Sequence, residues 1–309
     1  MHVYVAGING MVGSAIALEA LNQGHQVSGK PSNELDLTDR NAVFKEIRDS
    51  KPDYLVIAAA KVGGIGANTS LPVDFLTINL QIQCNLLDAA HAADISRVLF
   101  LGSSCIYPKF AEQPIVESAL LTGLLEPTNE PYALAKIAGL KLVNAYRKQF
   151  GHKWISVMPT NLYGPRDNFD LETAHVLPAL IHRFHLAKSS NFQNVEIWGD
   201  GEPMREFMHV EDLARASILL LNLYNGELAL NIGTGEEIKI KNLAILISKI
   251  VGYTGNITFN TNYPNGTPRK LLDSFRVSEL GWSPQVRLEE GITSTYHWFL
   301  ENAAKESTP

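Results

Sequence analysis

The first 160 residues alternate short apolar runs with amphipathic segments, and this rhythm restricts the possible folds more than any other feature. Strands are predicted at "HVYVAG", "HQVSG" and "DYLVIAAA", with helices between them over Met11–Gln23 and Thr38–Arg48. A helix over Val73–Ala93, the strand "RVLFLGS", a helix over Pro131–Phe150 and the strand "WISVMP" continue the series. The pattern predicts an α/β fold of Rossmann type, with a doubly wound parallel sheet.

The segment "GINGMVG" joins the first predicted strand to the first helix. Gly7, Gly10 and Gly13 permit a tight turn and let a pyrophosphate approach the backbone, and a helix N-terminus favours its negative charge. A purely structural turn is the simpler alternative, but the position inside a β-α-β unit favours a dinucleotide. The cofactor-binding residues expected in this loop are Gly7, Asn9, Gly10, Met11, Val12 and Gly13.

The end of the second predicted strand distinguishes NAD from NADP. An acidic residue there binds the ribose 2′-hydroxyl, whereas basic groups accept a 2′-phosphate. The sequence "VSGKPSNELD" offers Lys30 and has no carboxylate before Glu34. A solvated lysine is the ordinary alternative, yet the pattern favours NADP(H), with Lys30 among the cofactor-binding residues.

The segment "NEPYALAK" places Tyr132 and Lys136 four residues apart, on one face of a predicted helix. Ser103 stands at the carboxyl end of an earlier strand, where open α/β sheets bind their ligands. A neighbouring ammonium lowers the pKa of a phenol, so we expect Lys136 to activate Tyr132 while Ser103 holds a substrate carbonyl. The three residues predict a reductase that moves hydride to carbon and a proton to oxygen.

Beyond Pro159 the rhythm loosens, and "NLYGPRDNFD" and "WGDGEPMREF" combine glycine, proline and charge as functional loops do. Phe207–Leu221 is predicted as a strand and helix that return to the first sheet. The expected division is a dinucleotide-binding domain over 1–160 rejoined by about 207–235, a smaller substrate-binding region over 161–206 and 236–300, and a frayed tail over 301–309.

Composition excludes several classes of protein. A net charge of −6 argues against general affinity for nucleic acid, and two cysteines in 309 residues form neither a disulfide framework nor a zinc motif. The sequence contains no apolar run long enough to span a bilayer and no basic leader. We therefore expect a cytoplasmic enzyme with no metal, nucleic-acid or membrane partner.

Taken together, these motifs resemble the extended short-chain dehydrogenase/reductase family over essentially the whole chain. The resemblance includes "AAAKVGGIGAN", "LGSSCIYPK", "EPTNEPYALAKIAG", "MPTNLYGPRDNF", "HVLPALI", "PMREF" and "GTPRKLLD". It implies a GDP-sugar substrate: epimerisation of GDP-4-keto-6-deoxy-D-mannose at C3 and C5, then NADPH reduction at C4 to GDP-L-fucose. It also implies a homodimer that pairs through Val73–Ala93 and Pro131–Phe150.

The resemblance assigns epimerisation to Cys105 and His175. A ketone at C4 acidifies the protons at C3 and C5, and thiol and imidazole groups, with ordinary pKa values of about 8.5 and about 6.5, suit their transfer. A small buried hydrophobe is the alternative for Cys105, and it is our interpretation of Cys84. His182 lies close to His175 in the chain, as does His185, and spacing alone does not choose among the three.

Further site residues follow from the resemblance. The additional cofactor-binding residues are Leu101, Gly102, Ser103, Lys136, Pro159, Thr160, Asn161, Leu162 and His175. Guanidinium and ammonium groups suit a diphosphate, and the implied substrate-binding residues are Arg183, Trp198, Arg205, Asn265 and Lys270.

Two other functions stay open at this point. One is another nucleotide-sugar epimerase or dehydratase of the same fold, against which the pairing of Cys105 with His175 argues. The other is a dinucleotide sensor without activity, which would not need Ser103, Tyr132 and Lys136.

Overall fold

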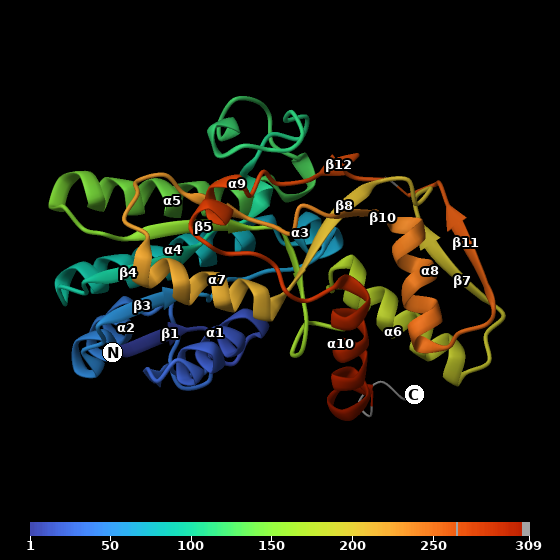
Figure 1. The fold of residues 1–309 in the computed structure, drawn as a ribbon, viewed down its shortest axis with the longest axis horizontal. Helices are drawn as coiled ribbons and strands as arrows, with labels where there is room; N and C mark the ends of the chain where they lie inside the picture. Colours follow the sequence, from blue (N-terminus) through green and yellow to red (C-terminus); the bar gives the residue numbers. More distant parts are fainter. Residues whose placement is uncertain (264, 305–309) are drawn as a thin grey trace.

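A six-stranded sheet forms the larger part of the computed structural model, which describes residues 1–263 and 265–304 (Figure 1). Its strand order is β2-β1-β3-β4-β5-β9, and every neighbouring pair is parallel. The predicted doubly wound parallel sheet is confirmed. Its strands are β1 (His2–Ala6), β2 (Gln26–Ser28), β3 (Tyr54–Ile57), β4 (Arg97–Leu101), β5 (Ile155–Pro159) and β9 (Leu230–Ile232).

Helices cover both faces of this sheet (Figure 1). On one face lie α2 (Arg40–Ser50), α4 (Pro72–Ala92) and α5 (Glu130–Phe150), and on the other lie α1 (Met11–Asn22) and α7 (Val210–Leu223). The helices predicted in the first half begin and end within two residues of their predicted bounds. Helix α2 begins at Arg40 rather than at Thr38 because the Asp39 carboxylate accepts hydrogen bonds from the backbone N–H groups of the first turn.

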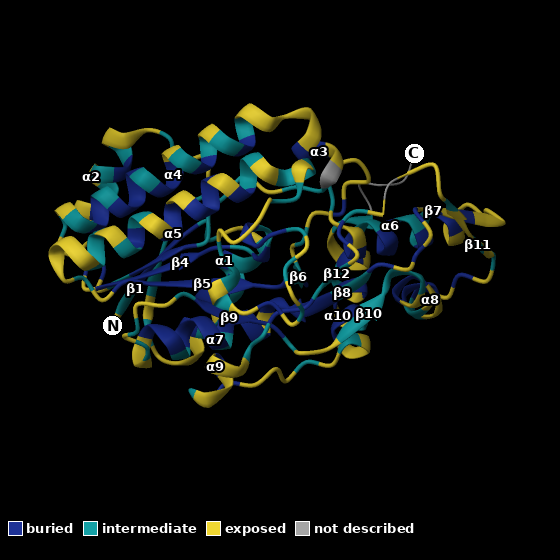
Figure 2. Cartoon of the chain, turned by 90° about the horizontal axis from the view of Figure 1, so that it is seen from above, coloured by how far each residue is buried: buried dark blue, intermediate teal, exposed yellow. Residues whose placement is uncertain are grey.

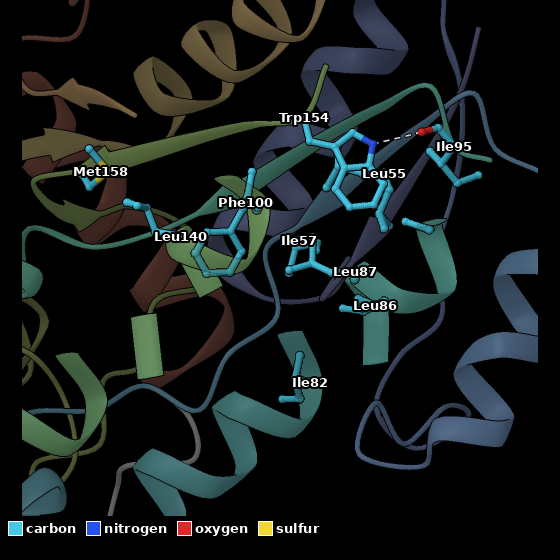
Figure 3. Packing of buried hydrophobic residues seen from close by; sticks show 14 of the residues in the cluster. Leu55, Ile57, Ile82, Leu86, Leu87, Ile95, Phe100, Leu140, Trp154 and Met158 are labelled. Atoms are coloured by element: carbon cyan, nitrogen blue, oxygen red, sulfur yellow. Dashed lines mark hydrogen bonds between the residues drawn. The ribbon is translucent and has the colours of Figure 1, made fainter. Parts of the chain in front are cut away.

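The apolar faces of these elements form two cores, one on each side of the sheet. The core beneath α4 and α5 contains Leu55, Leu86 and Phe100, all fully buried (Figure 3). Its largest residue is Trp154, whose indole N–H donates to the carbonyl of Ile95 at 3.0 Å. Figure 2 shows that the central strands of this sheet are buried while the outer faces of the helices are exposed. The sheet is thus a rigid support for the loops at its edge.

A second, smaller sheet stands beside the first. Strand β8 (Met204–His209) pairs with β10 (Glu237–Lys239), β12 (Arg269–Lys270) and β6 (Asn161–Tyr163). Strands β7 (Asn194–Trp198) and β11 (Asn256–Asn260) form a separate parallel pair at the outer end (Figure 1). The remaining helices are α3 (Ile65–Ser70), α6 (Val176–Ser189), α8 (Ile240–Val251), α9 (Phe275–Glu279) and α10 (Leu288–Asn302).

One prediction about chain path is wrong. The strand expected at Phe207 does not return to the first sheet, because β8 pairs there with Asn161 of β6. Of the predicted returning segment, α7, packed beside α1, and β9, paired with β5, rejoin the larger sheet. At the other end of the chain α10 continues through Asn302, so the expected tail begins as helix, and residues 305–309 lie outside the described part.

Within the described residues, no helix is both long and apolar enough to cross a membrane.

Candidate active site

The strand order reverses beside β1, since β2 lies on one side of it and β3 on the other. In open α/β sheets ligands bind at such a switch, outside the carboxyl ends of the strands. The glycine loop follows β1, Gly102 and Ser103 follow β4, and Thr160 follows β5. The predicted cofactor residues of three strands therefore meet at one edge of the sheet.

The glycine loop has the geometry of a cradle for a pyrophosphate. Gly7 has φ +88°, and a Cβ there would lie 2.8 Å from the nitrogen of Ala59. A Cβ on Gly13 would lie 2.0 Å from the carbonyl oxygen of Gly7, so neither position accepts a side chain. Helix α1 begins directly after Gly10, which leaves N–H groups of its first turn free for an anion. The residues present fit a dinucleotide.

Lys30 follows β2 as predicted, but its charge already has a partner. Its Nζ lies 3.0 Å from Oε2 of Glu46, and this hydrogen bond and charge raise the pKa of Lys30. The side chain is 43% exposed, so a ligand can reach it. Any 2′-phosphate bound here would share the lysine with Glu46.

Lys136 and Tyr132 lie on one face of α5, as their spacing predicts. The Lys136 Nζ donates to the carbonyl oxygen of Leu101 at 2.8 Å and lies 5.9 Å from the centre of the Tyr132 ring. Ser103 accepts the backbone N–H of Cys105 at 3.2 Å, and its hydroxyl also hydrogen-bonds to Tyr132. The chain therefore gathers the predicted serine, tyrosine and lysine at the end of β4.

The expected effect of Lys136 on the phenol is not what this structure shows. Burial raises the pKa of Tyr132 above its ordinary value, the charge of Cys105 adds to the rise, and a hydrogen bond with Ser103 opposes it. Burial also lowers the pKa of Lys136 to about 8. In the chain alone, desolvation outweighs any effect of the neighbouring lysine, so the pKa of Tyr132 is raised rather than lowered.

The thiol of Cys105 lies among hydrogen-bond donors. Its Sγ is 3.3 Å from Nδ2 of Asn129 and 3.8 Å from Nζ of Lys270. His175 is at the N-terminus of α6, and although it keeps solvent exposure, desolvation and then the charge of Lys270 lower the pKa of its imidazole. The charge of Lys270 thus acts on both the predicted cysteine and the predicted histidine.

The two neighbouring histidines, His182 and His185, form hydrogen bonds within the protein instead. His182 is buried and bonds through Nδ1 to the carbonyl oxygen of Phe169 at 2.6 Å. His185 bonds to the hydroxyl of Tyr296 at 3.1 Å. Geometry therefore separates the three histidines where spacing did not.

The predicted substrate residues fall into two groups. Arg205 lies opposite Lys270 in the pairing of β8 with β12, and the charges of Cys105 and Glu126 act on it. Burial, the largest effect, lowers the pKa of Arg205. Glu126 is itself bound by Lys109, at 3.0 Å. Arg205 and Lys270 form the inner group, which places net positive charge beside the thiol of Cys105.

The outer group lies at the end of β7. The Arg183 guanidinium stands 5.5 Å above the Trp198 ring, which stacks on Tyr263 at 4.3 Å with the planes 8° apart. Asn265 accepts the backbone N–H of Asp200 at 3.0 Å. Arg183 and Trp198 also line a pocket of about 260 Å³. The outer group thus offers a flat aromatic surface and a cation.

Sequence reasoning missed several residues of the site. Asn129, Glu126 and Tyr263 contact predicted residues, and Glu206 joins the second sheet to the segments around it. The Glu206 side chain is fully buried, and its carboxylate accepts the N–H groups of Gly235 at 2.8 Å and Leu272 at 3.1 Å. Only Asn129 left a usable signal, because it precedes Tyr132 by three residues and so shares its helix face.

Among the described residues there is no cluster of three or more histidine, cysteine, aspartate or glutamate side chains arranged to hold a metal.

A glycine cradle at a sheet switch point, with serine, tyrosine and lysine beside it, defines a dinucleotide-dependent enzyme of the short-chain dehydrogenase/reductase class. The chain belongs to the NAD dependent epimerase/dehydratase family, which matches residues 3–233.

Particular relatives cover nearly the whole chain. It is 52% identical to a putative GDP-L-fucose synthase 2 of Arabidopsis thaliana, over 98% of this chain and 93% of the relative. It is 50% identical to the GDP-L-fucose synthase of Escherichia coli K12, over 97% of each chain. A crystal structure of a GDP-L-fucose synthetase from Naegleria fowleri bound to NADP superposes with a TM-score of 0.90 at 28% identity, covering 98% of this chain and 95% of that one.

Proposed function

We propose that this protein converts GDP-4-keto-6-deoxy-D-mannose to GDP-L-fucose, by epimerisation at C3 and C5 followed by NADPH-dependent reduction at C4. The observation that carries the proposal is the Cys105 thiol, held by Asn129 and Lys270 next to the reductase residues Ser103 and Tyr132. A plain ketone reductase has no use for a thiol at this place. The printed names of relatives at about half identity agree with it.

NADP(H) is the cofactor. When bound, it would supply hydride to the C4 carbonyl. The glycine loop fits the pyrophosphate, and Lys30 lies at the strand end where a 2′-phosphate is recognised. The residues proposed to hold it are Gly7, Asn9, Gly10, Met11, Val12, Gly13, Lys30, Leu101, Gly102, Ser103, Lys136, Pro159, Thr160, Asn161, Leu162 and His175.

Epimerisation uses the thiol and the imidazole. One removes a proton from the carbon next to the ketone, the C–H electrons pass into an enolate, and the other returns a proton to the opposite face. Desolvation and then the charge of Lys270 lower the pKa of His175, which makes its protonated imidazole a stronger acid toward the enolate carbon. Ser103 and Tyr132 donate hydrogen bonds to the enolate oxygen.

Reduction uses the same oxygen site. A phenol is protonated at neutral pH, and burial raises the pKa of Tyr132 further, so Tyr132 has a proton to give to O4 during reduction at C4. Ser103 keeps the carbonyl in place, and Lys136 positions the end of β4 through Leu101. One set of donors therefore assists both steps.

We assign substrate binding to the inner and the outer group of predicted residues. Arg205 and Lys270 lie beside the reacting end, while Arg183, Trp198 and Asn265 lie in the outer group, where an aromatic surface can stack a base. We also propose that residues 1–160, with part of 207–235, serve the cofactor and that 161–206 and 236–300 serve the sugar nucleotide.

The reaction is tested with the ketosugar and NADPH in heavy water, following nicotinamide absorbance and deuterium at C3 and C5. We expect one NADPH oxidised per sugar and deuterium at both carbons. Cys105→Ser should reduce deuterium uptake strongly while NADPH still binds. Uptake at the wild-type rate in that variant would exclude the thiol, and unchanged NADPH would exclude the reductase.

A homodimer that pairs through α4 and α5 is proposed as well, because both helices expose apolar side chains, including Val73 and Leu134. Light scattering after size exclusion should give twice the chain mass of 34.0 kDa. We propose a cytoplasmic location, since the charged dinucleotide and sugar nucleotide cannot diffuse through a bilayer to reach an enzyme elsewhere. Fractionation of cells would test it.

A further inference from the structure

Asn129 occupies the N-cap position of α5 without capping the helix. Asparagine is among the preferred N-cap residues because its side-chain oxygen accepts a backbone N–H of the first turn. Here no such bond forms, and the amide points at Cys105 instead, with Nδ2 3.3 Å from Sγ. The Asn129 side chain therefore does not cap α5, which is the usual role of asparagine at this position.

The position of Asn129 is fixed by its backbone rather than by its side chain. Its N–H donates to the carbonyl oxygen of Glu126 at 3.2 Å, and the Glu126 carboxylate is bound by Lys109 and by Thr267, at 3.0 Å and 3.3 Å. Glu130 in the first turn of α5 suits the positive end of the helix dipole, and Pro131 suits the first turn. The helix start therefore does not depend on the Asn129 amide.

Asn129, Tyr132 and Lys136 follow one another at spacings of three and four residues, so they lie on one face of the segment that opens α5. Along this face the chain presents an amide, a phenol and an ammonium. The amide reaches the thiol, and the phenol and ammonium serve the ketone and the end of β4. The epimerase and reductase groups are thus aligned by a single helix.

We propose that Asn129 is a positioning residue for epimerisation, which aims the Cys105 sulfur and stabilises its anionic form through an N–H···S hydrogen bond. The inference rests on the proposed function and adds a residue to it. A hydrogen bond to a charged acceptor is stronger than one to a neutral acceptor, so the bond favours the thiolate. When the thiolate takes a proton from C3 or C5, an S–H bond forms and the bond from Asn129 weakens, while the enolate oxygen takes up the negative charge.

The test separates the two half-reactions. Epimerisation is measured as deuterium entering C3 and C5 of the ketosugar, and reduction is measured in reverse, as oxidation of GDP-L-fucose by NADP⁺, whose first step needs no epimerisation. In Asn129→Ala we expect deuterium uptake to fall about 10- to 100-fold, the range for loss of one hydrogen bond to a charged group. Oxidation of GDP-L-fucose should stay within about threefold of the intact protein, because the Asn129 amide bonds to the thiol of Cys105, which this half-reaction does not use.

A double variant shows whether Asn129 acts through the thiol. If it does, Cys105→Ser with Asn129→Ala should take up deuterium no more slowly than Cys105→Ser alone. Thr128→Ala is the matched control, since Thr128 lies in the same turn and its hydroxyl bonds to Glu126 rather than to Cys105. Equal losses in both half-reactions of Asn129→Ala, or additive losses in the double variant, would overturn the proposal.

A substrate-free measurement keeps the inference separate from the proposed function. Alkylation of Cys105 by iodoacetamide is followed by mass spectrometry from pH 6 to pH 10, in a Cys84→Ala background. The midpoint of the rate against pH should move upward in Asn129→Ala and stay in place in Thr128→Ala. An unmoved midpoint rejects the role of Asn129 even if the ketosugar is the substrate, and a moved one supports it even if the substrate is another.

Discussion

Lys136 directs its Nζ to the carbonyl oxygen of Leu101 at 2.8 Å. Leu101 is the last residue of β4, and Ser103 follows two residues later, so this bond ties α5 to the strand end that carries the serine. The lysine is only 4% exposed, and the face of Phe100 lies 5.1 Å from its nitrogen. A cation thus stands in a largely apolar place with one carbonyl as its bonded neighbour.

Stability should rise with pH because of this burial. The pKa of Lys136 is lowered to about 8 in the folded chain, against about 10.4 in an unfolded one. Between these values the unfolded chain binds a proton that the folded chain lacks, so raising the pH through this window favours folding. We expect the melting temperature of the cofactor-free protein to rise from pH 7.5 to pH 9.5 relative to Lys136→Met, measured by calorimetry. A parallel dependence in the two proteins would contradict the assignment.

Gly13→Ala should weaken the cofactor site. A methyl group there would lie 2.0 Å from the carbonyl oxygen of Gly7, so the loop must move, at a cost of about 1–3 kcal/mol in free energy of unfolding. We expect NADPH affinity, measured by fluorescence titration, to fall at least about tenfold, because backbone N–H groups leave the pyrophosphate. Gly66→Ala is the control, since its new methyl meets no atom closer than 3.6 Å.

Glu206→Gln should destabilise the second sheet. The carboxylate accepts two backbone N–H groups, and an amide keeps only one acceptor oxygen, so one buried donor loses its partner at about 1–3 kcal/mol. Urea unfolding should show this loss. The residue opposite in β10, Glu237, instead forms a partly exposed ion pair with Arg269, and Glu237→Gln should cost less than about 1 kcal/mol. Equal losses at both positions would argue against a special role for burial.

Acid should destabilise the end of α5. His152 stacks on Trp154 at 4.2 Å and bonds to His91 at 2.9 Å, and desolvation and then the charge of His91 lower its pKa, which Asp94 partly opposes. Between the lowered folded value and an unfolded value of about 6.5, the unfolded chain binds the extra proton, so stability is lost as pH falls through this window.

This loss is measured by urea unfolding at pH 7.5 and pH 5.5. The difference between the two pH values should shrink in His152→Gln and stay the same in His297→Gln, where the replaced side chain is exposed. A full acid loss in His152→Gln would show that other groups cause it.

The first half of the fold could be predicted because its elements are long and regular. A continuously buried strand such as "RVLFL" leaves an unbroken apolar run, and helices of 21 residues leave a strong helical period. The second sheet could not, since β6 and β10 have three residues each and β12 has two, too short for any alternation to show. Their pairing depends on partners such as Glu206, whose contacts the local sequence does not reveal.

The site was predicted by residue type more than by contact. Cys105 and Lys270 are separated by 165 positions, and a lysine carried over as a substrate ligand turns out to lie beside the thiol. The sign of the Tyr132 shift also depended on burial, which no spacing rule provides. The chemistry of a single motif can thus be predicted from sequence. The electrostatic effects of one motif on another depend on distances and burial, which only the folded structure provides.

The segment that carries Lys270 is attached on both sides. Strand β12 pairs with β8, while just beyond it Leu271 accepts the N–H of Ile115 at 2.8 Å and Asp273 donates to Ile115 at 2.9 Å. Ile115 belongs to the loop between Cys105 and α5. A hinge motion that separated the two sheets would have to break these two hydrogen bonds or move the loop with the second sheet. We therefore expect the sugar nucleotide to enter and leave through local rearrangement around the thiol rather than through a wide opening between the two sheets.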